Sequence, residues 1–254
     1  MRRTILYLWV LALCAMAFGC AGEDGSPGNP GSPGNPGSPL PIQVLLAGSE
    51  PSDSLQRLAI DIFATGLLPL GSAINVVDIT DSIPPLSFLN GYDAILVWTT
   101  SVVTDPVALG DRLADFVDDG GGVVIGQMSF VNGNGLQGRI MTQGYSPLVS
   151  AASVGALSNR KIDFLSIATP IHAILNGTNP LDFPFFSTSQ WSNPTLATGA
   201  TQIAADNPTG ASAIAVNAGD NIIGINMSGN FFRGGYEHPP ALFVNSLLFV
   251  AGAF

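Results

Sequence analysis

The sequence predicts an α/β domain with three layers: a mostly parallel central sheet covered by helices on both faces, with antiparallel hairpins late in the chain. Between residues 42 and 125, short apolar runs alternate with amphipathic helical segments, which favours a parallel sheet. The runs are apolar almost throughout, as in strands that are buried on both faces. Between residues 201 and 227, three short strand-like runs are separated by turn-rich segments, which indicates hairpins.

The first strand is expected over residues 42–47, where an apolar run ends in a polar loop. A helix should follow, because apolar residues recur at helical spacing and Gly66 supplies the stop; they are Leu55, Leu58, Ala59, Ile62 and Phe63. The apolar segments 73–79 and 92–98 predict the second and third strands.

A second helix should begin after Asp105, since an aspartate followed by Pro106 is a favourable helix start. Its buried face is predicted to contain Leu109, Leu113, Phe116 and Val117. Three glycines at 120–122 end it, and residues 123–125 form the fourth strand. Further strands are expected over 201–205, 211–216 and 221–227, and a terminal apolar helix over 241–250.

These segments, taken in order, resemble the class I glutamine amidotransferase-like superfamily, especially its ThuA-like branch. The resemblance is carried by Tyr92-Asp-Ala-Ile-Leu-Val-Trp98, Asp105-Pro106 with the helix after it, Gly120-Gly-Gly-Val-Val-Ile125, Pro170-Ile-His-Ala-Ile-Leu-Asn-Gly177, and the late strands from Gly199. It implies a flavodoxin-like sandwich spanning residues 42–254.

The resemblance also implies where a catalytic cysteine would stand: on a sharp turn after a central strand. The corresponding segment here is Gly126-Gln-Met-Ser-Phe130, with Met128 at the nucleophile position. We therefore expect the amidotransferase mechanism to be lost, and Ser129, one position along, is only a minor alternative nucleophile. The sequence predicts no catalytic residue, no cofactor and no metal site.

Ligands of open α/β sheets bind beyond the carboxyl ends of the strands. That rule nominates the loops after the strands, including residues 99–104, and yields these candidate ligand-binding residues: Glu50, Gln127, Ser129, Arg139, Arg233, Glu237 and His238. Alternatives remain open for several of them. Either arginine could instead pair with one of the many acidic residues. Glu237 and His238 either form an acid–base or metal pair or simply open the last helix, and His172 is expected to fix its own turn by hydrogen bonding.

The N-terminus resembles a bacterial lipoprotein signal. Two arginines precede an apolar run over residues 5–18, which ends in Ala17-Phe-Gly-Cys20. The predicted divisions are a signal peptide over 1–19, lipidated Cys20 with a Gly-X-Pro tether over 20–41, and the domain over 42–254. The location would be the bacterial cell envelope, anchored in a lipid bilayer on the periplasmic or outer side. Ordinary cleavage to a soluble secreted protein is the alternative. The collagen-like glycine period from Gly22 to Gly37 predicts a linker, with trimerisation as the alternative.

The chain has 18 acidic and 8 basic residues and a net charge of −10, which argues against nucleic acid as a partner. Once residues 1–19 are removed, Cys20 is the only cysteine that remains, and it is the predicted lipidation site. Disulfides within the chain and thiol catalysis are therefore excluded. We expect a non-catalytic domain that binds a glycan, a metabolite or an envelope protein. The alternatives are an envelope hydrolase or sugar-processing enzyme with a Glu/His/Arg site, and a structural surface protein.

Overall fold

A computed structural model of the chain describes residues 40–126, 128–133, 135–142, 144–156, 160–163, 172–175, 184–185, 190–207, 212–226 and 240–254. All elements given below lie within these ranges. The predicted signal peptide, Cys20 and nearly all of the tether lie outside them.

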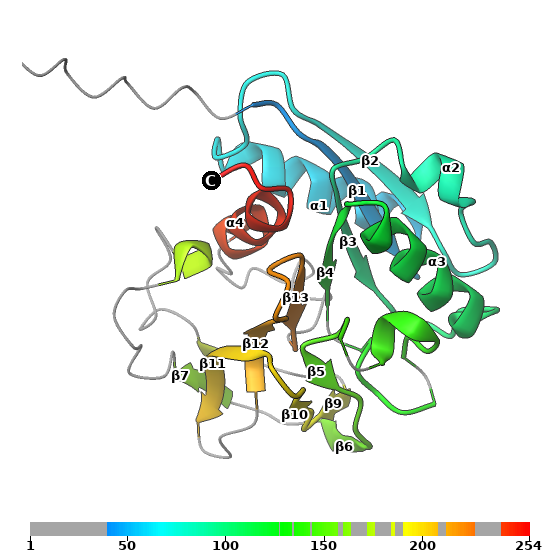
Figure 1. Cartoon of the computed structure of the whole chain (residues 1–254), viewed down its shortest axis with the longest axis vertical. Helices are drawn as coiled ribbons and strands as arrows, with labels where there is room; N and C mark the ends of the chain where they lie inside the picture. The colour runs from blue at the N-terminus through cyan, green and yellow to red at the C-terminus, as the bar shows by residue number, and fades with distance from the viewer. Residues whose placement is uncertain are drawn as a thin grey trace, which may run out of the picture. The chain divides into compact units, whose positions relative to one another are not determined.

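The described elements are organised around a nine-stranded sheet, and five of its strands run parallel (Figure 1). In spatial order these are β2 (Ala73–Asp78), β1 (Gln43–Gly48), β3 (Ala94–Trp98), β4 (Gly122–Ile125) and β13 (Ile222–Ile225). The order reverses at β1, because β2 lies on one side of it and β3 on the other. Such a reversal is typical of doubly wound sheets and marks where their ligands bind.

The other four strands of the sheet are antiparallel. They follow β13 in the order β12 (Ser212–Val216), β11 (Thr201–Asn207), β7 (Arg160–Asp163) and β8 (Pro184–Phe185). The predicted hairpins are confirmed, since β11, β12 and β13 pair in succession. The last of them also joins β4 in parallel, and this pairing links the two halves of the sheet.

Shorter elements complete the described chain. Two small sheets pair β5 (Leu148–Val149) with β10 (Thr195–Leu196) and β6 (Ser153–Ala156) with β9 (Gln190–Ser192). Two 3₁₀ turns, η1 (Arg139–Met141) and η2 (Ala173–Leu175), and a one-turn helix α2 (Leu86–Leu89) stand in connections. None of these short elements was predicted from the sequence.

Helices cover both faces of the parallel half and give the three predicted layers. On one face α1 (Ser52–Ala64) and α4 (Pro240–Val250) pack on Val44 and Leu46. On the other face α3 (Pro106–Asp118) and α2 pack on Leu45 and Ala47. Alternate residues of β1 therefore serve opposite cores, as the two-residue period of a strand requires.

The start of α3 confirms the predicted cap. The Asp105 carboxylate accepts a hydrogen bond of 2.9 Å from the backbone N–H of Ala108, and Pro106 occupies the first turn. This bond satisfies one of the N–H groups that a helix start leaves without an intrahelical partner. At the other end, Gly120 adopts φ of 99°, a conformation that glycine enters at little cost.

Candidate functional site

The carboxyl ends of four parallel strands meet at one edge of the sheet. Gly48 of β1 is level with Trp98 of β3, and Ile125 of β4 is level with both Val97 and Gly224. The chain segments that follow these strands therefore leave the sheet at the same edge. We call this set the carboxyl edge; it consists of Ser49, Glu50, Thr99, Thr100, Met128, Ser129 and Asn226.

Glu50 is the buried acid of the carboxyl edge, with 8% of its surface exposed. Its Oε1 accepts hydrogen bonds from Nε1 of Trp98 at 3.3 Å and from Oγ1 of Thr100 at 2.6 Å. Both donors come from β3 and the loop after it. Two hydrogen bonds to one oxygen hold this carboxyl group in a fixed position.

A second pair of contacts joins the same two loops. The Ser49 hydroxyl donates to the carbonyl of Ser101 at 2.9 Å and accepts from the N–H of Ser101 at 2.9 Å. The N–H of Ser49 also donates to the carbonyl of Trp98 at 3.2 Å. The loops that follow β1 and β3 thus form one connected unit around Glu50.

The turn after β4 contains a strained residue. Met128 has φ of 66°, and Asp220 is the other non-glycine residue with positive φ in the described part of the chain. Residues held in the left-handed region persist where the surrounding structure fixes them. Here the carbonyl of Met128 accepts from Val131 N–H at 3.1 Å, and the carbonyl of Ser129 accepts from Leu136 N–H at 3.0 Å.

Three buried polar atoms of the carboxyl edge have no hydrogen-bond partner within the described residues. They are Oγ1 of Thr99, Oγ of Ser129 and Oδ1 of Asn226. The three side chains are at most 1% exposed and follow the adjacent strands β3, β4 and β13. A buried polar group without a partner costs about 1–3 kcal/mol, so three at neighbouring strand ends call for an explanation.

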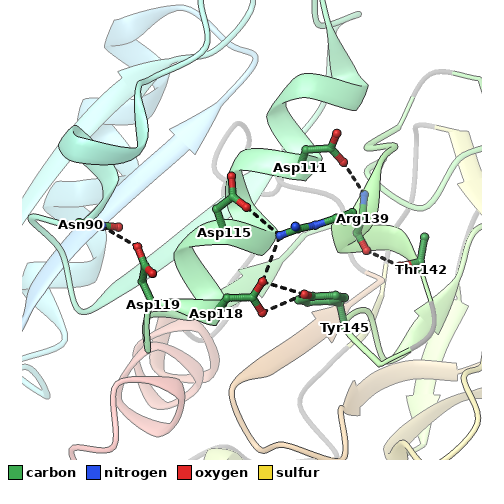
Figure 2. A network of polar contacts seen from close by, with 8 residues as sticks. All are labelled: Asn90, Asp111, Asp115, Asp118, Asp119, Arg139, Thr142 and Tyr145. Atoms are coloured by element: carbon green, nitrogen blue, oxygen red, sulfur yellow. Dashed lines mark hydrogen bonds and ion pairs between the residues drawn. The ribbon is translucent and has the colours of Figure 1, made fainter.

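Among the predicted ligand-binding residues, the structure brings Glu50 and Ser129 to the carboxyl edge. It places Arg139 elsewhere, on η1 against α3, where the guanidinium pairs with Asp115 at 2.8 Å and Asp118 at 3.1 Å (Figure 2). The predicted alternative, that this arginine pairs with acids of the chain, is the arrangement found. Gln127, Arg233, Glu237 and His238 lie outside the described residues, so the acid–base pair stays a prediction.

Tyr145 belongs to the same network as Arg139. Its hydroxyl donates to Asp118 at 2.8 Å, and the Arg139 guanidinium lies 5.9 Å from the centre of its ring. The hydrogen bond to the Asp118 carboxylate raises the pKa of Tyr145 above 10, because loss of the proton would place two negative charges together. This network attaches η1 to α3, as Figure 2 shows, and presents no free cation toward a ligand.

Sequence reasoning nominated Thr99 and Thr100 but missed Trp98 and Asn226. Trp98 is the last residue of the third predicted strand, where it counts as apolar, although its indole N–H donates to Glu50. Asn226 lies within the strand predicted over 221–227, whereas β13 ends at Ile225. The apolar run 222–225 followed directly by an asparagine is the sequence signal that could have indicated the strand end and a polar group there.

Two hollows in the described surface lie away from the carboxyl edge. One, of about 480 Å³, is at the amino ends of β3 and β4 and is lined by Asp93, Asp119 and Gly121 among others. The other, of about 240 Å³, lies beside β5 and β10. Within the described residues, no group of three or more histidine, cysteine or acidic side chains could hold a metal ion. The candidate site therefore rests on the polar groups of the carboxyl edge.

No family model matches the sequence, and no curated protein matches it. Several solved structures, however, match its fold. A ThuA-like protein of Bacteroides uniformis superposes with a TM-score of 0.57 at 15% identity, covering 87% of this chain and 95% of that one. The chain has the flavodoxin-like fold of ThuA-like proteins. The fold predicted from the sequence is therefore confirmed.

Two cytoplasmic proteins of Salmonella typhimurium also match, both at 13% identity. The first superposes with a TM-score of 0.53, and the match covers 81% of this chain and 98% of that one. The second superposes with a TM-score of 0.51, and the match covers 82% of this chain and 99% of that one. That they are named cytoplasmic contradicts the predicted location in the cell envelope, and this prediction is withdrawn. Within the described part of the chain, no helix combines the length and hydropathy needed to cross a bilayer.

Proposed function

We propose that this protein is a non-catalytic binding domain that takes a small polar molecule at the carboxyl edge. The observation that carries the proposal is the row of buried polar atoms without partners on Thr99, Ser129 and Asn226. A ligand that reached these buried groups, directly or through an ordered water, would recover the free energy lost by leaving them without partners. Doubly wound folds bind their ligands at this same edge of the sheet.

The charges beside the carboxyl edge favour a neutral or cationic ligand. Glu50 belongs to the edge itself, and acidic residues also stand at the end of β2 or shortly after β1 and β2, namely Asp53, Asp78 and Asp81. The Arg139 guanidinium is engaged with α3. A polyol or an amine would meet acceptors and hydroxyl groups here, whereas a phosphate or carboxylate would meet negative charge.

The non-catalytic part of the proposal depends on Met128. By the superfamily resemblance, this residue stands where a cysteine nucleophile would, on the turn after β4. A thioether has no proton to lose and cannot form the thiolate that such chemistry needs. The strained turn is retained with φ of 66°, and in this proposal it shapes the binding site.

Ligand screening by thermal shift and calorimetry tests the proposal. We expect neutral polyols or primary amines to stabilise the protein, by about 2.7 kcal/mol at a hundredfold excess over Kd, and matched phosphates and carboxylates to fail. Thr99→Val and Ser129→Ala should each weaken binding about tenfold, because each removes one hydrogen-bonding group.

Ser246→Ala is the matched control, because the Ser246 hydroxyl is also buried without a partner but lies on α4 in the helical layer. It should leave affinity unchanged. Equal losses in all three variants, binding of anions alone, or ammonia release from glutamine by the wild-type protein would each overturn the proposal.

A further inference from the structure

Several large apolar side chains on α1 and beside it are exposed. Ile60 and Phe63 on α1 are 67% and 48% exposed, and Leu67 and Leu70 in the loop after it are 45% and 100% exposed. Leu40 is 78% exposed, and its segment lies beside the end of the loop after α1, because the N–H of Ile42 donates to the Ser72 hydroxyl at 3.0 Å. We call these five residues the α1 face.

The apolar character of this face is not explained by the fold itself. The inner side of α1 already packs in the core through Leu55, Leu58 and Ile62. The outer side of such a helix is normally polar. Exposed apolar residues gathered on one face instead mark an interaction surface. Among the described strands, β2 pairs only with β1, so the sheet also ends on this side (Figure 1).

The charges on α1 indicate what covers the face. Arg57 and Asp61 stand four residues apart, on the same flank of Ile60, and no ion pair within the described residues includes either. In an antiparallel pair of identical helices whose two-fold axis is level with position 59, position 57 of one helix faces position 61 of the other. A basic and an acidic residue at these positions make α1 complementary to itself, as an interface with two-fold symmetry requires.

We propose that two copies of this chain pair through the α1 face, with the two α1 helices antiparallel about a two-fold axis level with Ala59, one residue from Ile60. Arg57 then meets Asp61 of the partner subunit twice, once on each side of the axis. Five side chains at roughly 100 Å² each would cover on the order of 500 Å² per copy. That is more than half of the roughly 800 Å² that each partner buries in a stable interface.

Sedimentation velocity of the full chain over a range of concentrations tests the pairing. The wild-type protein should sediment as a dimer. Ile60→Asp should raise the dissociation constant about a hundredfold or more, because two-fold symmetry introduces the change twice at the centre of the interface. Val102→Asp is the matched control: Val102 is 68% exposed but lies in the loop after β3, and its variant should remain dimeric.

A charge exchange tests the antiparallel geometry. Arg57→Asp and Asp61→Arg should each weaken the dimer about tenfold, since each replaces two attractive pairs with two repulsive ones. The double variant Arg57→Asp/Asp61→Arg should recover wild-type affinity. A monomeric or trimeric wild-type protein, equal loss in Val102→Asp, or no recovery in the double variant would overturn the proposal.

Discussion

The indole Nε1 of Trp98 donates a hydrogen bond of 3.3 Å to Oε1 of Glu50, so the side chain at the end of β3 is satisfied by the residue that follows β1. Thr100 donates to the same oxygen. The Trp98 ring leaves no room at Gly48, where an added Cβ would lie 2.6 Å from a ring carbon. Glu50 therefore supports the edge as well as supplying charge to it.

These two roles of Glu50 can be separated by substitution. Glu50→Gln keeps an acceptor oxygen for Trp98 and Thr100, so we expect the free energy of unfolding to change by less than about 1 kcal/mol. Glu50→Ala leaves the buried Trp98 N–H without its acceptor and should cost about 1–3 kcal/mol. Urea denaturation measures both. Equal destabilisation by the two variants would contradict a structural role carried by the hydrogen bonds.

Strain at Met128 gives a second prediction. Glycine enters the left-handed region freely, whereas a β-branched residue is disfavoured there. Met128→Gly should therefore leave stability unchanged or raise it by up to about 1 kcal/mol, and Met128→Val should lower it by about 1–3 kcal/mol. Chemical denaturation of the two variants beside wild type checks this ordering. A glycine variant less stable than the valine variant would show that side-chain packing, not backbone strain, dominates at this turn.

Much of the fold could be predicted because its signals are local. The Asp105 cap and the apolar runs of β1, β3 and β4 each depend on a few neighbouring residues. The candidate site was predicted only in part. The residues next to Arg139 in the sequence do not indicate which groups its guanidinium contacts. Its partners Asp115 and Asp118 lie 24 and 21 residues earlier. Such pairing depends on how η1 packs against α3, and the spacing of apolar residues along the chain does not indicate that packing. The two-residue β5 and β10 are likewise too short to leave a pattern.

Gly110 provides a test in which helix propensity and packing disagree. It lies inside α3, where alanine would normally stabilise by about 1 kcal/mol. An added Cβ, however, would lie 1.7 Å from the backbone carbonyl oxygen of Gln137, which cannot move as a flexible side chain could. We therefore expect Gly110→Ala to destabilise the protein by about 2 kcal/mol or more.

Val107→Ala on the same helix is the control for Gly110→Ala, because Val107 is 45% exposed. Its effect on the free energy of unfolding should stay within about 0.5 kcal/mol. A neutral or stabilising Gly110→Ala variant would mean that the segment after Ser129 moves away from α3 at little cost. Thermal and urea denaturation of both variants decide between these outcomes.

The pH dependence of stability should depend in part on His172. Its ring lies 4.8 Å from the ring of Phe249, and its Nδ1 accepts a hydrogen bond from Ile174 N–H at 3.4 Å. Burial lowers the pKa of His172 below 6.5 because it disfavours the charged imidazolium, and the negative charge of Asp220 opposes this only in part.

The sign of the effect follows from proton binding. Below pH 6.5 the unfolded chain binds a proton at this histidine that the folded chain resists. The stabilising contribution of neutral His172 is therefore complete above about pH 6.5 and is lost as the pH falls toward the depressed pKa of the folded state. His172→Asn keeps an acceptor for Ile174 but does not titrate. The free energies of unfolding of the two proteins, measured from pH 8 to pH 5, should diverge below pH 6.5, with the wild type falling more steeply by at most about 1.4 kcal/mol per pH unit. Because both proteins share every other titrating group, parallel curves would show that the ring is protonated in the folded state as readily as in the unfolded one.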